Sequence, residues 1–79
     1  MPTLFIFFGL RFFFWSREHE PIHVHVEREG KVAKFDIVPE VVLIENNGLK
    51  QRDIATAKAL IEENKEEIIR RWNEYFKEL

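Results

Sequence analysis

The chain has no cysteine, only three glycines and three prolines, and a single serine, Ser16. Without cysteine it holds neither a disulfide framework nor a thiolate metal site. It contains no glycine-rich phosphate loop, no dinucleotide fingerprint and no nucleophilic serine or cysteine motif. Seventy-nine residues are enough for one domain, residues 1–79, and apolar packing has to supply its stability.

The chain also lacks a strong charge of either sign. Twelve basic and fourteen acidic residues give a net charge of −2, whereas a domain that binds phosphates is usually basic, so nucleic acid is not indicated as a partner. The apolar run from Leu4 to Trp15 is shorter than the roughly 20 residues of a membrane-spanning helix, and no signal-peptide pattern surrounds it. We expect a soluble, cytoplasmic protein with no membrane partner.

Aromatic and β-branched residues are plentiful, and their pattern predicts the fold. The N-terminal aromatic run, interrupted at Gly9, favours one bent strand or two short ones. Further strands are expected over 22–27, 32–38 and 41–45, with a hairpin turn at Gly30. We predict an α+β domain, in which a small antiparallel sheet of three to five strands, over about residues 3–45, is packed by a long C-terminal helix over about 50–78.

The helix prediction depends on apolar residues that recur every three to four positions. Its buried stripe is expected to include Ile54, Ile61, Ile68 and Trp72. Asn64 is the weakest helix former in the stretch, so a kink or a division into two helices at that point is the alternative.

A run of four aromatic residues suggests a contact surface. Phe12, Phe13, Phe14 and Trp15 follow one another, and they predict either the core of a small protein or an interface with a partner protein or with a second copy in a homo-oligomer. Base stacking is disfavoured because basic residues are not interleaved with these aromatics.

All three histidines lie within seven positions, at His19, His23 and His25. On a strand, the i, i+2 spacing of the last two places both imidazoles on one face, with Cα atoms roughly 6–7 Å apart. We expect that face to be exposed or at a rim, with Lys34 and Asp36 close by on the neighbouring strand.

The cluster supports three interpretations. His19, His23 and His25 could ligate a transition metal, zinc or nickel. Alternatively, His25 could act as a general base with His23 as its partner, and Lys34 or Arg28 could bind an anion. In the third interpretation a histidine ahead of the strand donates a hydrogen bond to a backbone carbonyl and holds the loop around Pro21.

Several short segments together resemble a known family. They are Phe7-Phe8-Gly9, the motif Glu18-His19-x-Pro21-x-His23-x-His25, Lys34-Phe35-Asp36-Ile37 and Ile68-Ile69-x-x-Trp72. The chain resembles the small prokaryotic proteins grouped as domain of unknown function 4160. The resemblance implies a short free-standing protein, often encoded beside a second small protein in an arrangement like a toxin–antitoxin module. It implies no established activity, and the family's motif histidines correspond to His19, His23 and His25.

The function that follows is an interaction protein. We expect it to bind a partner protein encoded nearby, or itself, within a two-gene module of toxin–antitoxin type, and to have no enzymatic activity. The alternative is a small histidine-dependent nuclease or metal-dependent hydrolase that uses His23 and His25.

Overall fold

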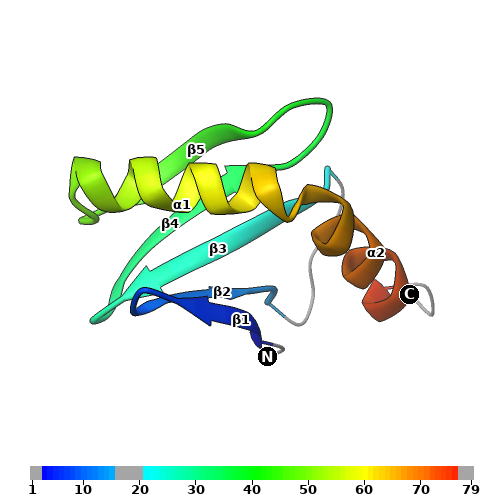
Figure 1. The fold of residues 1–79 in the computed structure, drawn as a ribbon, viewed down its shortest axis with the longest axis horizontal. Helices are drawn as coiled ribbons and strands as arrows, with labels where there is room; N and C mark the ends of the chain where they lie inside the picture. Colours follow the sequence, from blue (N-terminus) through cyan, green and yellow to red (C-terminus); the bar gives the residue numbers. More distant parts are fainter. Residues whose placement is uncertain (1–2, 16–20, 77–79) are drawn as a thin grey trace.

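Five strands precede two helices in the computed structural model, which describes residues 3–15 and 21–76 (Figure 1). The strands are β1 (Thr3–Phe7), β2 (Leu10–Phe13), β3 (His23–Arg28), β4 (Lys31–Asp36) and β5 (Val42–Asn47). Each pairs antiparallel with its neighbour in sequence, so the sheet order is β1-β2-β3-β4-β5. The predicted α+β architecture with an antiparallel sheet is confirmed, at the upper end of the expected strand number.

Two hairpin turns have the same backbone pattern. Phe8 and Gly9 join β1 to β2 with φ of 53° and 78°, and Glu29 and Gly30 join β3 to β4 with φ of 52° and 83°. Two successive positive φ angles match the type I′ turn, whose twist suits a two-residue hairpin. Gly9 therefore forms a turn between two strands rather than a bend within one.

The prediction of one long helix over 50–78 is wrong. The structure has α1 (Gln51–Glu63) and α2 (Lys65–Phe76), separated by Asn64, where φ is −110° and ψ is 20°. The Asn64 side chain donates a hydrogen bond of 2.8 Å to the carbonyl of Leu60. Asparagine competes in this way for backbone groups, which makes it a poor residue inside a helix. The alternative of two helices divided at Asn64 describes the structure.

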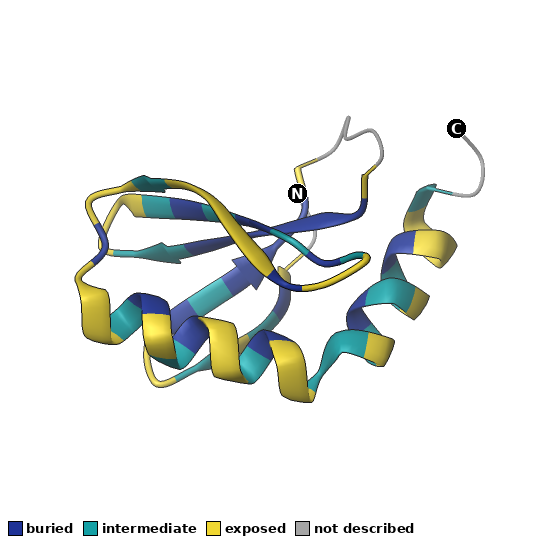
Figure 2. Cartoon of the chain, turned by 90° about the horizontal axis from the view of Figure 1, so that it is seen from above, coloured by how far each residue is buried: buried dark blue, intermediate teal, exposed yellow. Residues whose placement is uncertain are grey.

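Helix α1 lies over one face of the sheet, whereas α2 turns away after Asn64 and runs along the end of the strands, so that the core lies between the sheet and the two helices (Figures 1 and 2). The apolar stripe predicted for the helical region is buried there, at Ile54, Ile61, Ile68 and Trp72. Trp72 packs edge-to-face against Phe14, with ring centroids 5.2 Å apart. From the sheet, the core on this side includes Leu10, Phe12, Val24, Val26, Ala33 and Phe35.

The opposite face of the sheet carries charged and aromatic side chains. Arg11 and Glu27 lie opposite each other on β2 and β3, and the Arg11 Nε donates to Glu27 Oε1 at 3.1 Å. This hydrogen bond lowers the pKa of the Glu27 carboxyl. The Arg11 guanidinium also lies 4.1 Å from the ring centroid of Phe13.

Among residues 3–15 and 21–76, no helix is long and apolar enough to cross a membrane.

Candidate functional site

Strand β3 places the imidazoles of His23 and His25 on the face that carries Arg11 and Phe13. Their direct partners on β4 are Asp36 and Lys34, so the predicted neighbourhood of the histidines is confirmed. The expected exposure is wrong, because the two residues are only 5% and 3% exposed. Aromatic side chains from β2 and α2 lie against the imidazoles, and a sequence pattern on β3 alone carries no sign of them.

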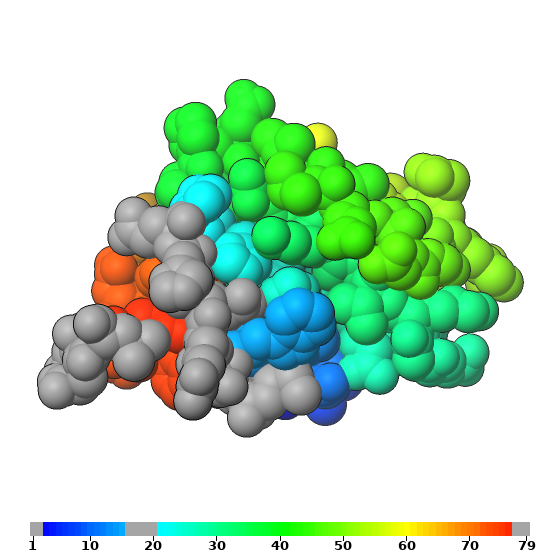
Figure 3. Space-filling view, turned by 180° about the vertical axis from the view of Figure 1, so that it is seen from behind, coloured from blue at the N-terminus to red at the C-terminus, as the bar shows by residue number. Residues whose placement is uncertain are grey.

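The His25 ring stacks on two aromatic neighbours. The Trp15 ring lies 4.0 Å from it, centroid to centroid, at an interplanar angle of 23°. Phe13 is 5.5 Å away at 28°. Figure 3 views this side of the molecule, where the blue of the Leu10–Trp15 segment adjoins the cyan of β3. The rings of Phe13 and Trp15 are themselves only 6.4 Å apart, so they lie on adjacent sides of the imidazole and do not enclose it between them.

His23 is fixed by two rings and a backbone carbonyl. Its ring lies edge-on to His25 at 5.3 Å and to Trp72 at 5.1 Å. Its Nδ1 lies 2.8 Å from the carbonyl oxygen of Pro21. Since a carbonyl oxygen only accepts, Nδ1 carries the proton in this hydrogen bond. The third interpretation expected such a bond from a histidine ahead of the strand, whereas His23 is itself the first residue of β3.

A hollow of about 420 Å³ adjoins His25 on the same side of the sheet. Trp15, His25 and Lys34 contribute to its lining, together with Glu45 from β5. The hollow thus brings together an imidazole, an ammonium group and a carboxylate. Such a set can exchange protons with a bound molecule and can hold an anion.

Arg28, the second residue predicted to bind an anion, lies elsewhere. Its Nη2 donates to the carbonyl of Phe8 at 2.5 Å, and its Nε lies 3.2 Å from Asp53 Oδ2. It lines a different hollow of about 620 Å³, at the start of α1, with Lys31 and Lys50. The structure therefore does not bring Arg28 and Lys34 together on one site with the histidines.

The metal prediction concerns one residue outside the described part of the chain. His19 lies in the segment 16–20, which the structure does not describe. Within 3–15 and 21–76, no three His, Cys, Asp or Glu side chains are grouped so that they could hold a metal ion. His23 and His25 offer two imidazoles close together, and the three-histidine site stays a prediction.

Of the aromatic run predicted as an interface, only Trp15 is exposed, at 48%. Phe12, Phe13 and Phe14 are at most 2% exposed, so they belong to the interior of the folded chain. The Trp15 ring is partly exposed and also stacks on His25. The exposed aromatic surface is therefore much smaller than four consecutive aromatic residues suggest.

Sequence reasoning missed the exposed aliphatic residues on the outer strands of the sheet. Val42, Leu43 and Ile44 on β5 are 43%, 38% and 49% exposed, and Ile6 on β1 is 62% exposed. Figure 2 shows β5 mostly in the colour of exposed residues. A signal was present, because the last strand of a meander is an edge strand and the stretch from Val41 to Ile44 carries no charge.

Comparison with known proteins places the chain in a family without giving it a function. Neither the curated proteins nor the solved structures include a match to this chain. A family model described as domain of unknown function (DUF4160) matches residues 9–73, a range that begins at the β1–β2 turn and ends within α2. Since that match spans most of the sequence, the chain belongs to the DUF4160 family.

Proposed function

We propose that this protein is a small interaction protein, which binds another protein or a second copy of itself through the open edges of its sheet. The observation that supports the proposal is the exposure of aliphatic side chains on both outer strands. Ile6 lies on β1, and Val42, Leu43 and Ile44 lie on β5.

An exposed apolar edge strand favours strand addition. Its outward backbone N–H and C=O groups can pair with a strand of another chain, while its side chains give specificity. Many proteins guard such edges with lysine, proline or inward-pointing charges. The stretch from Val41 to Ile44 has none of these, and the first charged residue after it is Glu45.

We further propose that the protein partner is the product of a neighbouring gene, in a toxin–antitoxin-like pair in the cytoplasm of a prokaryote. Family membership supports this through the gene arrangement that the DUF4160 resemblance implies. Direct strand pairing between the two products would use the exposed aliphatic side chains of β1 and β5.

Co-expression tests the proposal. The tagged chain and the untagged product of the adjacent gene are produced together, and co-purification is measured for wild type, Ile6→Lys and Ile44→Lys. Ala59→Lys, on the exposed side of α1, is the matched control for an added charge. We expect the complex to survive the control and to be lost in at least one edge variant, since a buried unpaired lysine strongly opposes association. No complex with wild type, or one that survives both edge changes, would contradict the proposal.

A second function is favoured by the hollow beside His25. A histidine-dependent nuclease or a metal-dependent hydrolase would use His25 as general base or ligand, His23 as its partner, and Lys34 to hold an anionic substrate. Lys34 and His25 do line one hollow, and they are cross-strand partners.

Elemental analysis and an activity assay separate this second function from the first. Wild type, His25→Phe and Lys34→Met are assayed on an activated phosphodiester after purification without chelator. His25→Phe retains an aromatic ring beside Phe13 and Trp15, so the fold is expected to persist while activity and any bound zinc or nickel disappear. Absence of both metal and hydrolysis in wild type would remove the enzyme from consideration.

A further inference from the structure

We propose that two copies of this chain pair through β5, antiparallel and about a two-fold axis, so that their sheets join into one. This inference rests on the proposed function, and it names a second copy of the chain as the occupant of one of the two edges. Three observations favour β5 and a self-pairing arrangement.

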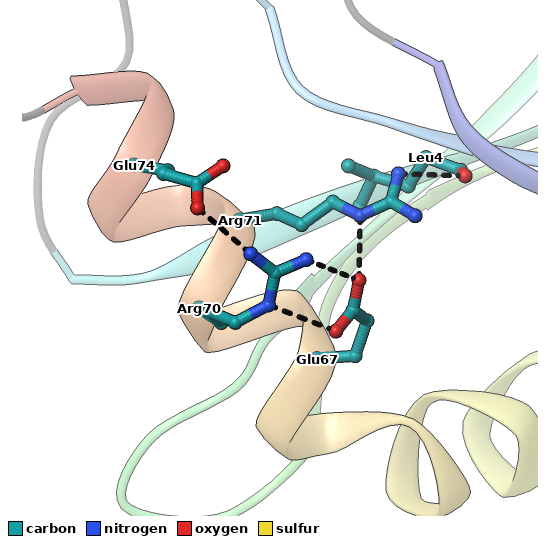
Figure 4. A network of polar contacts seen from close by, with 5 residues as sticks. All are labelled: Leu4, Glu67, Arg70, Arg71 and Glu74. Atoms are coloured by element: carbon teal, nitrogen blue, oxygen red, sulfur yellow. Dashed lines mark hydrogen bonds and ion pairs between the residues drawn. The ribbon is translucent and has the colours of Figure 1, made fainter.

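The first observation is that α2 already engages the backbone of the other edge strand. Arg71 Nη1 donates to the carbonyl of Leu4 on β1 at 3.0 Å (Figure 4). Arg71 is itself held by Glu67, whose Oε2 lies 2.8 Å from the Arg71 Nε. Between 21 and 76 and between 3 and 15, no side chain hydrogen-bonds to the backbone of β5. β5 is therefore the more available edge.

The second observation is that β5 is apolar and exposed on both sides of the sheet. Val42 lies opposite Asp36, on the face of the histidines, whereas Leu43 lies opposite Phe35, on the face of the helices. Ile44 falls at the register shift and has no partner on β4. A lone extended peptide covers the edge but little of either face. A second sheet that continues beyond the edge covers residues on both faces, and another copy of this domain is such a sheet.

The third observation is that the charge pattern of β5 permits the strand to pair with itself. A two-fold axis between Leu43 and Ile44 sets each Leu43 opposite an Ile44 of the other copy and each Glu45 opposite a Val42. The two Glu45 carboxylates then do not face each other, and each stays beside Lys34 of its own chain. A two-fold arrangement also closes after two copies, whereas head-to-tail pairing of β1 with β5 would build a larger ring or an open-ended filament.

The bulge at Ile44 limits how far regular pairing can extend. A short strand pair buries less surface than the roughly 1,200 Å² of a stable interface, so we expect a dimer that dissociates on dilution in the micromolar range.

Light scattering coupled to size exclusion tests the dimer on wild type, Ile44→Lys and Ile6→Lys, from roughly 1 µM to roughly 1 mM. We expect wild type and Ile6→Lys to approach twice the chain mass of 9.6 kDa, and Ile44→Lys to stay at that mass. The two variants make the same change on opposite edges of the sheet, which makes Ile6→Lys the matched control. A wild type that is monomeric throughout, or a dimer lost through Ile6→Lys and kept by Ile44→Lys, overturns the inference.

Hydrogen exchange on wild type gives an answer even if Ile44→Lys fails to fold. Amide exchange in Val42–Asn47 should slow at high protein concentration, while exchange in Thr3–Phe7 stays unchanged. Equal exchange of β5 at both concentrations overturns the inference. A chain that is monomeric but still binds the adjacent gene product through an edge overturns the self-pairing and leaves the proposed function standing.

Discussion

His23 is one side chain that connects three parts of the molecule. It bonds the Pro21 carbonyl ahead of β3, meets His25 on its own strand and packs against Trp72 of α2. A buried histidine with neighbours of this kind contributes to stability through its ring and through its donor nitrogen separately.

Two substitutions separate these contributions. His23→Phe keeps an aromatic ring against Trp72 but removes the donor to Pro21, so we expect a loss of about 1 kcal/mol of unfolding free energy. His23→Ala removes the ring as well and should cost about 2–4 kcal/mol. Urea unfolding followed by circular dichroism measures both values. Equal losses in the two variants would show that the ring packing contributes nothing.

For the two histidines, the sequence predicted which side chains lie next to them on the adjacent strand, but it did not predict that they are buried. The i, i+2 spacing and the hairpin predicted that Lys34 and Asp36 would lie next to the histidines, which they do. The burial of His23 arises partly from Trp72, a residue far along the chain whose position depends on how α2 turns after Asn64. Local patterns do not contain that information.

Among the elements, the two type I′ turns have the same backbone but different surroundings. Gly30 has φ of +83°, and an added Cβ would meet no atom within 4 Å. Gly9 has φ of +78°, and an added Cβ would lie 2.9 Å from Arg28 Nη1. The guanidinium of Arg28 is held there by Phe8 and Asp53, so it is not free to yield.

Alanine substitutions should therefore have unequal costs. We expect Gly30→Ala to lower the unfolding free energy by about 1 kcal/mol, because only left-handed backbone strain is added. Gly9→Ala should cost about 2 kcal/mol, because it also displaces Arg28. Thermal or urea unfolding compares them. A Gly9→Ala variant as stable as Gly30→Ala would show that Arg28 relaxes without loss.

Helix α2 carries a charge network that responds to pH. Hydrogen bonds from Arg70 and Arg71 lower the pKa of Glu67 from the usual 4.5 to about 2. Arg70 also reaches Glu74, with 2.7 Å between Nη1 and Oε2. Because the folded-state pKa is below the unfolded one, the stabilisation is present above pH 4.5 and is lost as pH falls toward about 2.

We expect the melting temperature of wild type to fall more steeply than that of Glu67→Gln between those two pH values. The difference should be small, and salt should reduce it, since the network is exposed to solvent. Calorimetric scans at low and high ionic strength, with Glu66→Gln as the control, measure it. Parallel pH profiles for wild type and Glu67→Gln would count against the network.

Element types were predictable because they depend on local chemistry. Alternation gave the strands, glycine gave the turns, and the 3–4-residue period gave the helical region. The helix break at Asn64 was only an alternative, because helix propensity there differs by a few tenths of a kcal/mol from that of its neighbours. The exposed edge at β5 depends on the strand order of the whole sheet, and the sequence signals it only through the uncharged stretch from Val41 to Ile44.

For the whole molecule, the Arg28–Asp53 ion pair joins the sheet layer to the helix layer. Arg28 ends β3 and also bonds Phe8 in the first hairpin turn, while Asp53 lies in the first turn of α1. The Asp53 side chain is 14% exposed and that of Arg28 is 34% exposed, so water screens the pair only in part.

A double-mutant cycle isolates this connection. Arg28→Met should cost about 2 kcal/mol, because it removes both the ion pair with Asp53 and the hydrogen bond to the Phe8 carbonyl, and Asp53→Asn should cost about 1 kcal/mol. We expect the double variant to be about as stable as Arg28→Met alone, which gives a coupling of about 1 kcal/mol. Additive losses in urea unfolding would mean that the two side chains do not interact in solution.

The strictly sequential strand order has a consequence for how this chain folds. Every strand pairs with its neighbour in sequence, so the sheet is built from hairpins with short connections and a low contact order. Such hairpins form locally, without first closing a long loop. We expect rapid folding, in which the sheet grows from one hairpin to the next.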